Sequence, residues 1–181
     1  MTVLRIHTDG ACSGNQNEEN LGGWGAVLEY GKHRRELFGG EKNTTNNRME
    51  MTALIKAMAA IKKENQTIEI YSDSAYLMDC FRQKWYVKWL SNGWLTTGNK
   101  PVENRDLWEQ LLPYLDLHSI SFFRVKGHVN LDHPSTDKEK LYEKFVEWNG
   151  MGFSWQDFIY ATEMNHRADA LANQGIDSIR E

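Results

Sequence analysis

Two acidic residues stand in two similar stretches of the chain, and acids in this pattern suggest a metal site. Asp9 lies in the phrase Ile-His-Thr-Asp-Gly-Ala, and Asp73 lies in Ile-Tyr-Ser-Asp-Ser-Ala. Apolar and polar residues alternate before each acid, as in a β-strand with one buried face. If the strands are neighbours, the carboxylates lie side by side, and unit charges about 4 Å apart repel by about 4 kcal/mol at an effective dielectric constant of about 20. Hard divalent cations such as Mg²⁺, which prefer oxygen ligands, would remove this cost.

Two further acids belong to expected helices. Glu50 lies in the first turn of a helix opening at Asn46, and Asp169 lies in the last helix. Each acid also has a structural interpretation. An Asp at a strand end is common in turns, and Glu50 follows Asn47 at the spacing of a capping box. Asp169 can pair with His166, three residues earlier on the same helix face.

The elements that must position these acids form a mixed sheet with helices. We expect three strands joined by short connections as an antiparallel meander, then a helix, a strand, helices, a strand and a last helix. Their expected bounds are strands at 3–9, 22–30, 34–40, 67–73 and 120–125, and helices from 46, from 74, over 107–115 and up to Gly175. This order indicates an α/β (α+β) fold with a five-stranded mixed sheet, its first three strands antiparallel, flanked by helices.

Composition favours one soluble domain spanning residues 1–181. The hydrophobic content of 40% supports a real core, and no apolar run is long enough to span a membrane. Cys12 and Cys80 form neither a disulfide framework nor a zinc cluster, which favours a reducing, cytoplasmic location. The net charge of −4 argues mildly against nucleic-acid binding, but residues 129–162 carry six acids and three lysines and so hold most of it.

Six short motifs resemble, in order, those of the type 1 ribonucleases H. They cover nearly the whole chain except residues 129–162, and any one of them alone is weak. The motifs are Asp-Gly-Ala-Cys-Ser-Gly-Asn at 9–15, Thr-Asn-Asn-Arg-Met-Glu at 45–50, Ser-Asp-Ser at 72–74, Lys-Pro-Val-Glu-Asn-Arg-Asp-Leu-Trp at 100–108, Val-Lys-Gly-His at 125–128 and Asn-His-Arg-Ala-Asp-Ala-Leu-Ala at 165–172.

The resemblance implies an endoribonuclease that hydrolyses the RNA strand of RNA–DNA hybrids, leaving 5′-phosphate and 3′-hydroxyl ends. It implies that Asp9, Glu50, Asp73 and Asp169 converge and bind two Mg²⁺ or Mn²⁺ ions, which suits phosphodiester hydrolysis. His128 would transfer a proton and help the product leave, a role in which histidine is common. Taken alone, a loop histidine is more often a surface residue.

The resemblance also implies contacts with the substrate. Asn15, Asn46 and Asn47 would contact the RNA strand, because amides donate to and accept from 2′-hydroxyl groups. Thr45 and Asn104 would hold a DNA phosphate. The asparagines equally suit turns and helix caps.

A stretch rich in tryptophan corresponds to the family's basic protrusion, which grips the DNA strand. Residues 81–102 hold four basic residues and no acids. Trp85 and Trp89 lie four residues apart on one helix face. Each of them can therefore either pack in the core or contact the substrate.

Residues 129–162 form a longer connection than the family usually has. Thr136–Glu139 and Ser154–Asp157 both resemble capping boxes, so we expect a helical insertion in which the second helix continues into the last one. Because the segment is acidic, we expect it to support the fold as a structural cover, with a lid near the site as the alternative.

Two other functions share parts of this pattern. A ribonuclease H-like DNA recombinase or resolvase would use similar carboxylates, and a non-catalytic hybrid-binding module would need none. We expect no separate hybrid-binding domain, no obligate protein partner, no membrane association and a monomer.

Overall fold

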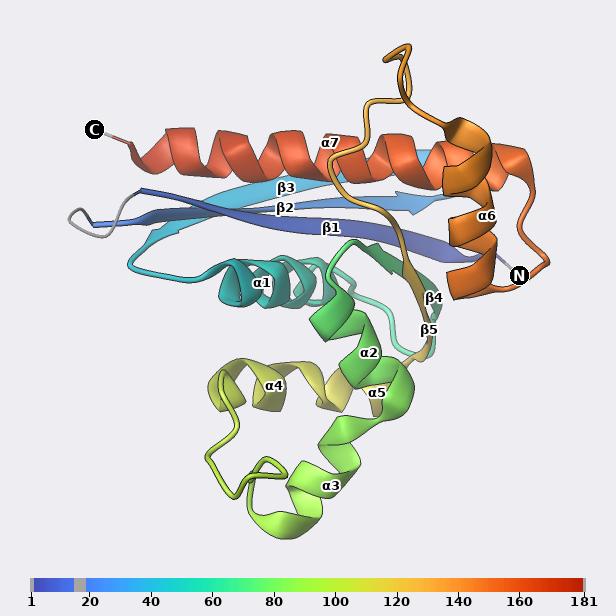
Figure 1. Cartoon of the computed structure of the whole chain (residues 1–181). Coiled ribbons are helices and arrows are strands. Elements are labelled where there is room, and N and C mark those ends of the chain that lie inside the picture. Colours follow the sequence, from blue (N-terminus) through green and yellow to red (C-terminus); the bar gives the residue numbers. More distant parts are fainter. Residues whose placement is uncertain (1, 15–18, 181) are drawn as a thin grey trace.

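The computed structural model describes residues 2–14 and 19–180. Its centre is a five-stranded sheet in the order β3-β2-β1-β4-β5, in which β1, β2 and β3 are antiparallel and β4 and β5 run parallel to β1 (Figure 1). The strands are β1 Leu4–Ser13, β2 Leu21–Tyr30, β3 His33–Lys42, β4 Thr67–Ser72 and β5 Ser119–Arg124. The predicted mixed sheet with an antiparallel start is therefore confirmed.

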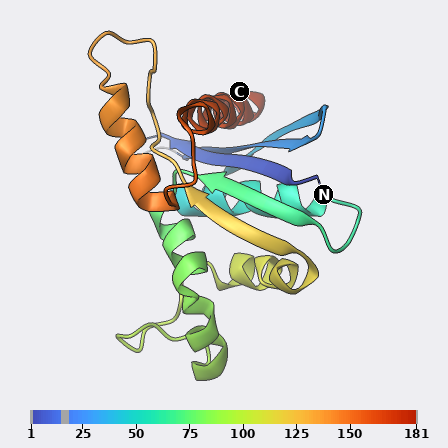
Figure 2. The same ribbon diagram turned by 90° about the vertical axis from the view of Figure 1, so that its right-hand side faces the viewer.

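Helices cover both faces of the sheet. Helices α1 to α5 lie on one side of the sheet, where α1, α2 and α5 contact the strands, and the other face carries α7, with α6 beside it (Figures 1 and 2). The helices are α1 Asn46–Ala59, α2 Ala75–Gln83, α3 Trp85–Asn92, α4 Arg105–Leu111, α5 Pro113–Leu117, α6 Lys138–Asn149 and α7 Trp155–Ile179. The single helix expected over 107–115 is thus two helices, with Pro113 at the start of the second. None of the helices in the described ranges is both long and apolar enough to cross a membrane.

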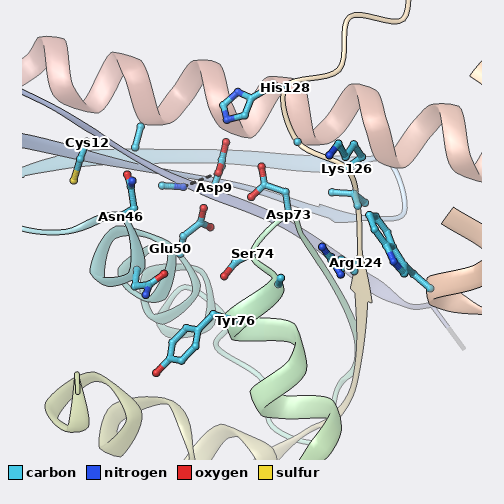
Figure 3. A pocket seen from close by; sticks show the side chains of 17 residues that line it. Asp9, Cys12, Asn46, Glu50, Asp73, Ser74, Tyr76, Arg124, Lys126 and His128 are labelled. Atoms are coloured by element: carbon cyan, nitrogen blue, oxygen red, sulfur yellow. Dashed lines mark hydrogen bonds between the residues drawn. The ribbon is translucent and has the colours of Figure 1, made fainter. Parts of the chain in front are cut away.

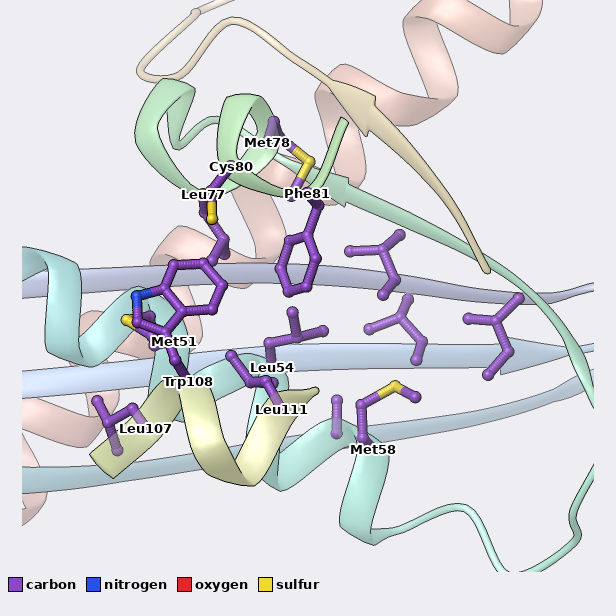
Figure 4. Packing of buried hydrophobic residues seen from close by; sticks show 14 of the residues in the cluster. Met51, Leu54, Met58, Leu77, Met78, Cys80, Phe81, Leu107, Trp108 and Leu111 are labelled. Carbon is purple, nitrogen blue, oxygen red and sulfur yellow. The ribbon is translucent and has the colours of Figure 1, made fainter. Parts of the chain in front are cut away.

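The main core lies between the sheet and α1, α2 and α4. Trp108 is fully buried there, and its indole Nε1 donates to the Tyr76 hydroxyl at 3.3 Å. Apolar side chains of α1, including Leu54 and Met58, and Phe81 of α2 complete this core (Figure 4). Burying side chains of this size contributes about 1.5–3 kcal/mol each, so this face gives the active-site elements a rigid base.

The register of β1 and β4 brings the two strand-borne acids together. Thr8 pairs with Ser72 across the parallel strands. Asp9 and Asp73, each one residue further on, therefore lie at adjacent positions where β4 ends, while β1 continues to Ser13. The expected adjacency of the two similar phrases is confirmed.

The last helix packs closely on the sheet and continues beyond its expected end. A Cβ added at Gly175 would lie 2.0 Å from the backbone oxygen of Gly39, and one at Gly25 would lie 2.4 Å from that of Ala168. The prediction that Gly175 terminates the helix is wrong, because α7 runs on to Ile179. Gly175 permits close helix–sheet approach rather than a left-handed cap.

Residues 129–162 contain α6 and the first turns of α7. The capping box at Ser154 and Asp157 is present, whereas α6 is capped by Asp137, whose side chain accepts from the backbone N–H of Lys140 at 3.1 Å. Both helices bury aromatic side chains against β4 and β5, on the face that α7 also covers. We call this group the second cluster; its buried members are Tyr71, Val125, Phe145, Phe158 and Ala161.

Candidate active site

Three of the four predicted acids meet at one end of the sheet. Asp9 comes from β1, Glu50 from the start of α1, and Asp73 directly follows β4 (Figure 3). One carboxylate oxygen from each lies within 4.8 Å of the other two. They line a cavity of about 580 Å³ that is also bounded by Asn46, Asn47, Lys126 and His128.

The position of Glu50 excludes the interpretation that it forms a capping box with Asn47. Thr45 is the N-cap of α1, and its hydroxyl accepts from the backbone N–H of Arg48 at 3.1 Å. Asn47 is therefore already inside the helix, and Glu50 is not the partner of a cap. Its carboxylate is buried in the acid cluster instead.

Burial and mutual repulsion disfavour the ionised state of these acids. Burial, with added repulsion from Asp73 and Asp169, raises the pKa of Asp9 to about 8. Burial and then the charges of Asp9 and Asp73 raise the pKa of Glu50 well above its ordinary value. Burial also raises the pKa of Asp73, although the nearby His128 opposes this shift.

Two carboxylate oxygens in the cluster have no hydrogen-bond partner. Asp9 Oδ1 accepts from the backbone N–H of Gly10 at 2.9 Å, but Asp9 Oδ2 and Glu50 Oε2 are buried and unpartnered among the described residues. Buried polar atoms are normally paired, and carboxylate oxygens are the ligands that Mg²⁺ and Mn²⁺ prefer. The donor set therefore fits a hard divalent cation.

Asp169 stands at the edge of this cluster. It lies half-buried on α7, and its charge contributes to the raised pKa of both Asp9 and Asp73. Its carboxylate is not part of the group of oxygens within 4.8 Å. No hydrogen bond or ion pair joins Asp169 to His166 in the described ranges, so their pairing is not present.

His128 lies on the loop that follows β5, in contact with the same cavity. It is exposed and has a left-handed backbone with φ of 58°. The preceding Gly127 packs against the acid cluster, since a Cβ there would lie 2.1 Å from Asp73 Oδ2. Glycine at this position lets the loop approach Asp73.

The predicted substrate residues lie on two surfaces. Asn46 and Asn47 line the acid cavity, exposed at the start of α1, while Asn15 lies outside the described residues. Asn104 accepts from Arg48 Nη1 at 3.2 Å, and Arg48 follows the exposed cap Thr45 by three residues. Arg48 thus links the two residues predicted to hold a DNA phosphate.

The two tryptophans of α3 differ in burial. Trp89 is 8% exposed, with its ring centroid 6.0 Å from that of Trp94 and 5.5 Å from that of Trp108. Trp85 is only half-buried and meets Tyr76 edge-on. Core packing thus accounts for most of the surface of Trp89. Both also line a second cavity of about 580 Å³ that includes Lys88 and Lys100.

Several residues of the acid cavity were not among the predicted site residues, and two of them have large side chains that bear on its chemistry. Arg124 at the end of β5 and Trp148 of α6 both line it. The sequence offered only a weak signal for Trp148, which continues the apolar stripe of Leu141 and Phe145 along α6. Arg124 directly precedes the Val-Lys-Gly-His motif but carries no motif of its own.

Comparison with known proteins identifies the family. A family model of RNase H matches residues 1–177. The chain belongs to the ribonuclease H family. This confirms the predicted family and enzyme class, a hydrolase that cuts the RNA strand of RNA–DNA hybrids.

Relatives and solved structures agree with this assignment. The ribonuclease H of Moorella thermoacetica is 50% identical over 138 residues, which cover 76% of this chain and 87% of that protein. That of Clostridium botulinum is 42% identical over 149 residues, 82% of this chain and 99% of that protein.

Solved ribonucleases H share the fold. LC9-RNase H1, a type 1 RNase H with the type 2 active-site motif, aligns with a TM-score of 0.63 and 24% identity over 91% of this chain and 85% of that one. LC11-RNase H1, solved in complex with an RNA/DNA hybrid, aligns with a TM-score of 0.53 and 19% identity over 97% of each chain. The predicted fold class is confirmed.

Proposed function

We propose that this ribonuclease H hydrolyses the RNA strand at the cavity lined by Asp9, Glu50 and Asp73, with Asp169 completing the catalytic acids. The observation that carries the proposal is the convergence of three carboxylates, two of which have an unpartnered buried oxygen. A non-catalytic hybrid-binding module has no use for such a cluster, because its charge would repel phosphate. The family assignment disfavours the recombinase or resolvase alternative.

The four acids would hold two divalent cations, Mg²⁺ or Mn²⁺. When bound, such ions neutralise phosphate oxygens and the charge that develops as a phosphodiester is hydrolysed to 5′-phosphate and 3′-hydroxyl ends. Asp9 and Glu50, whose carboxylates are buried, would hold the ions at the base of the cavity. His128, on the exposed side of the cavity, transfers a proton to the departing product.

The acid cavity and the cavity lined by Trp85 and Trp89 are the proposed contact surfaces for the hybrid. Asn46 and Asn47 reach the RNA strand from the acid cavity. Asn15, which lies outside the described residues, is proposed as a further contact with the same strand. Thr45 and Asn104, linked by Arg48, hold a DNA phosphate. Trp85, with Trp89 behind it, and the lysines of the second cavity contact the DNA strand. LC11-RNase H1, which shares this fold, was solved in complex with an RNA/DNA hybrid, and this supports a hybrid as the ligand.

We propose that the chain acts as a monomer in the cytoplasm without an obligate protein partner. Residues 1–181 then form one catalytic domain, in which the helical insertion 129–162 supports the sheet. The support for this role is the second cluster, in which Phe145 and Phe158 cover Tyr71 and Val125.

One experiment tests the function. Labelled RNA–DNA hybrid, double-stranded DNA and double-stranded RNA are incubated with Mg²⁺ and the wild type, Asp73→Asn or Asp116→Asn. Asp116 is an exposed acid on α5, so its variant is the matched control. We expect the wild type and Asp116→Asn to cut only the RNA of the hybrid, and Asp73→Asn to leave it intact. An intact hybrid with the wild type, or equal cleavage by Asp73→Asn, overturns the proposal.

A further inference from the structure

Arg124 is a cation in the wall of the acid cavity that takes no part in the chemistry described above. It ends β5, and Figure 3 shows it on the same side of the cavity as Asp73 and Lys126. Its guanidinium carbon lies 4.0 Å from the centre of the Trp148 ring. Trp148 belongs to α6, so the helical insertion reaches the active-site cavity through this stacked pair.

The backbone of Arg124 is held firmly. The Asn149 side chain accepts from its backbone N–H at 2.8 Å and donates to its carbonyl oxygen at 2.7 Å. The same amide also donates to the carbonyl oxygen of Phe145 at 2.9 Å. Because Asn149 anchors α6 to β5 in this way, the side chain of Arg124 is not needed for that attachment.

The guanidinium itself lacks an anionic partner. Its Nε is buried and unpartnered, and among the described residues no carboxylate forms an ion pair with it. A guanidinium carries five N–H donors in a planar arrangement. Of these nitrogens only Nε is buried without a partner, which is unfavourable. The side chain is only half-buried and lines the cavity, so the other N–H groups are those that can meet the acceptors of a ligand.

Two lysines lie near Arg124. Lys144 lies 5.5 Å from the centre of the Trp148 ring and pairs with Glu147 at 3.6 Å. Lys126 lines the cavity beside Arg124. Arg124 and Lys126 therefore line the same cavity as the acid cluster, on the side of Asp73, so a bound nucleic acid meets these two cations next to the acids.

We propose that Arg124, held flat on Trp148, binds a backbone phosphate of the RNA strand next to the phosphate that is hydrolysed. Guanidinium groups match phosphate oxygens by bidentate hydrogen bonds, and stacking on an aromatic ring preorganises their plane. The strand is the RNA strand because Arg124 shares the cavity of the acids that cut it; in this respect the inference rests on the proposed function. The helical insertion thereby contributes to substrate binding through Trp148.

Steady-state kinetics with hybrid and Mg²⁺ test the role of the side chain. For Arg124→Gln we expect KM to rise about tenfold and the slope of log KM against log salt to fall by about one, because one phosphate contact is lost. We expect kcat to change little. Arg124→Lys restores the salt slope but only part of the KM, since it keeps the charge and loses the planar fork.

Arg82→Gln is the matched control. It removes a cation that touches the same Asn149 but does not line the cavity, so its KM should stay within about twofold of the wild type. Equal KM values for Arg124→Gln and Arg82→Gln overturn the inference. Inactivity of the wild type on every hybrid would instead refute the proposed function, so the two failures are distinguishable.

Hybrids with one uncharged methylphosphonate at a time locate the contact. At one position of the RNA strand, adjacent to the cleavage site, the substitution should raise the KM of the wild type and leave that of Arg124→Gln unchanged. If a methylphosphonate raises the KM of the wild type and of Arg124→Gln by the same factor at every position, the assignment is overturned. It is also overturned if the position at which only the wild type responds lies on the DNA strand. Circular dichroism melting of Arg124→Gln excludes unfolding as the cause, and Trp148→Leu should raise KM while retaining the salt slope.

Discussion

Replacing Gly127 by alanine should disable the active site without unfolding the protein. A Cβ at this position would lie 2.1 Å from Asp73 Oδ2 and 2.9 Å from its Cγ. These separations are far below van der Waals contact, so either the carboxylate or the loop bearing His128 must move. A shift of about 1 Å in a catalytic group lowers turnover by about 100-fold.

The cost to folding should be small, because the atoms in conflict belong to a side chain that can rotate. We expect Gly127→Ala to lower kcat on hybrid by about 100-fold and to keep Tm within about 4 °C of the wild type. The concentration of Mn²⁺ needed for half-maximal activity should also rise, since Asp73 is one of the proposed ligands.

Gly152→Ala is the control for this substitution. A Cβ at Gly152, in the turn between α6 and α7, would meet no atom within 4 Å. This variant should keep both kcat and Tm. If Gly127→Ala retains more than about half of the wild-type kcat, or if its Tm falls steeply, the reasoning about Asp73 is refuted.

Three further predictions concern stability. Phe145→Ala removes a side chain that is 2% exposed in the second cluster and should lower the free energy of unfolding by about 3–5 kcal/mol in urea titrations, with kcat retained; an unchanged midpoint would show that the cluster is not stabilising. Deleting 131–161 and inserting a short glycine linker should lower Tm strongly while the folded fraction keeps its kcat, and a folded deletion variant without turnover would contradict the structural role. Hydrogen bonds from Arg167 and Arg34 hold the pKa of Glu36 at about 2, below the ordinary value of about 4.3, so this stabilisation is present above that ordinary value and is lost as pH falls toward 2. Glu36→Gln should therefore lower Tm at pH 7, with the gap to the wild type closing between about pH 4.3 and 2; a gap independent of pH would contradict the ion pair.

The sheet and the strand-borne acids were predictable from local pattern. The alternation of apolar and polar residues in β1 and β4 predicts which face of the sheet each side chain points to. The similar phrases around Asp9 and Asp73 predict that the two acids lie side by side if the strands are neighbours. Local rules were insufficient for Glu50, whose spacing from Asn47 imitates a capping box although Thr45 is the cap. Here the resemblance to a family, rather than the spacing, predicted the correct surroundings.

Contacts between distant segments were not predictable in this way. Gly175 has the local character of a helix end, but its lack of a side chain is needed for contact with Gly39 of β3. Likewise Arg124 and Trp148 meet only because α6 packs on the end of β5. Neither contact leaves a periodic trace in the sequence, since each depends on the packing of elements that are far apart along the chain.

The continuity of α7 makes the insertion and the fourth acid parts of one element. Phe158, in the second cluster, and Asp169 belong to the same helix of 25 residues. Eleven residues separate them, which is roughly 16 Å along the axis and about three full turns, so they lie on nearly the same side of the helix. One residue inserted between them would turn Asp169 away by about 100°. Length variation among related chains should therefore accumulate in the connections before α6 and before α7, while the stretch from Phe158 to Asp169 keeps a constant length.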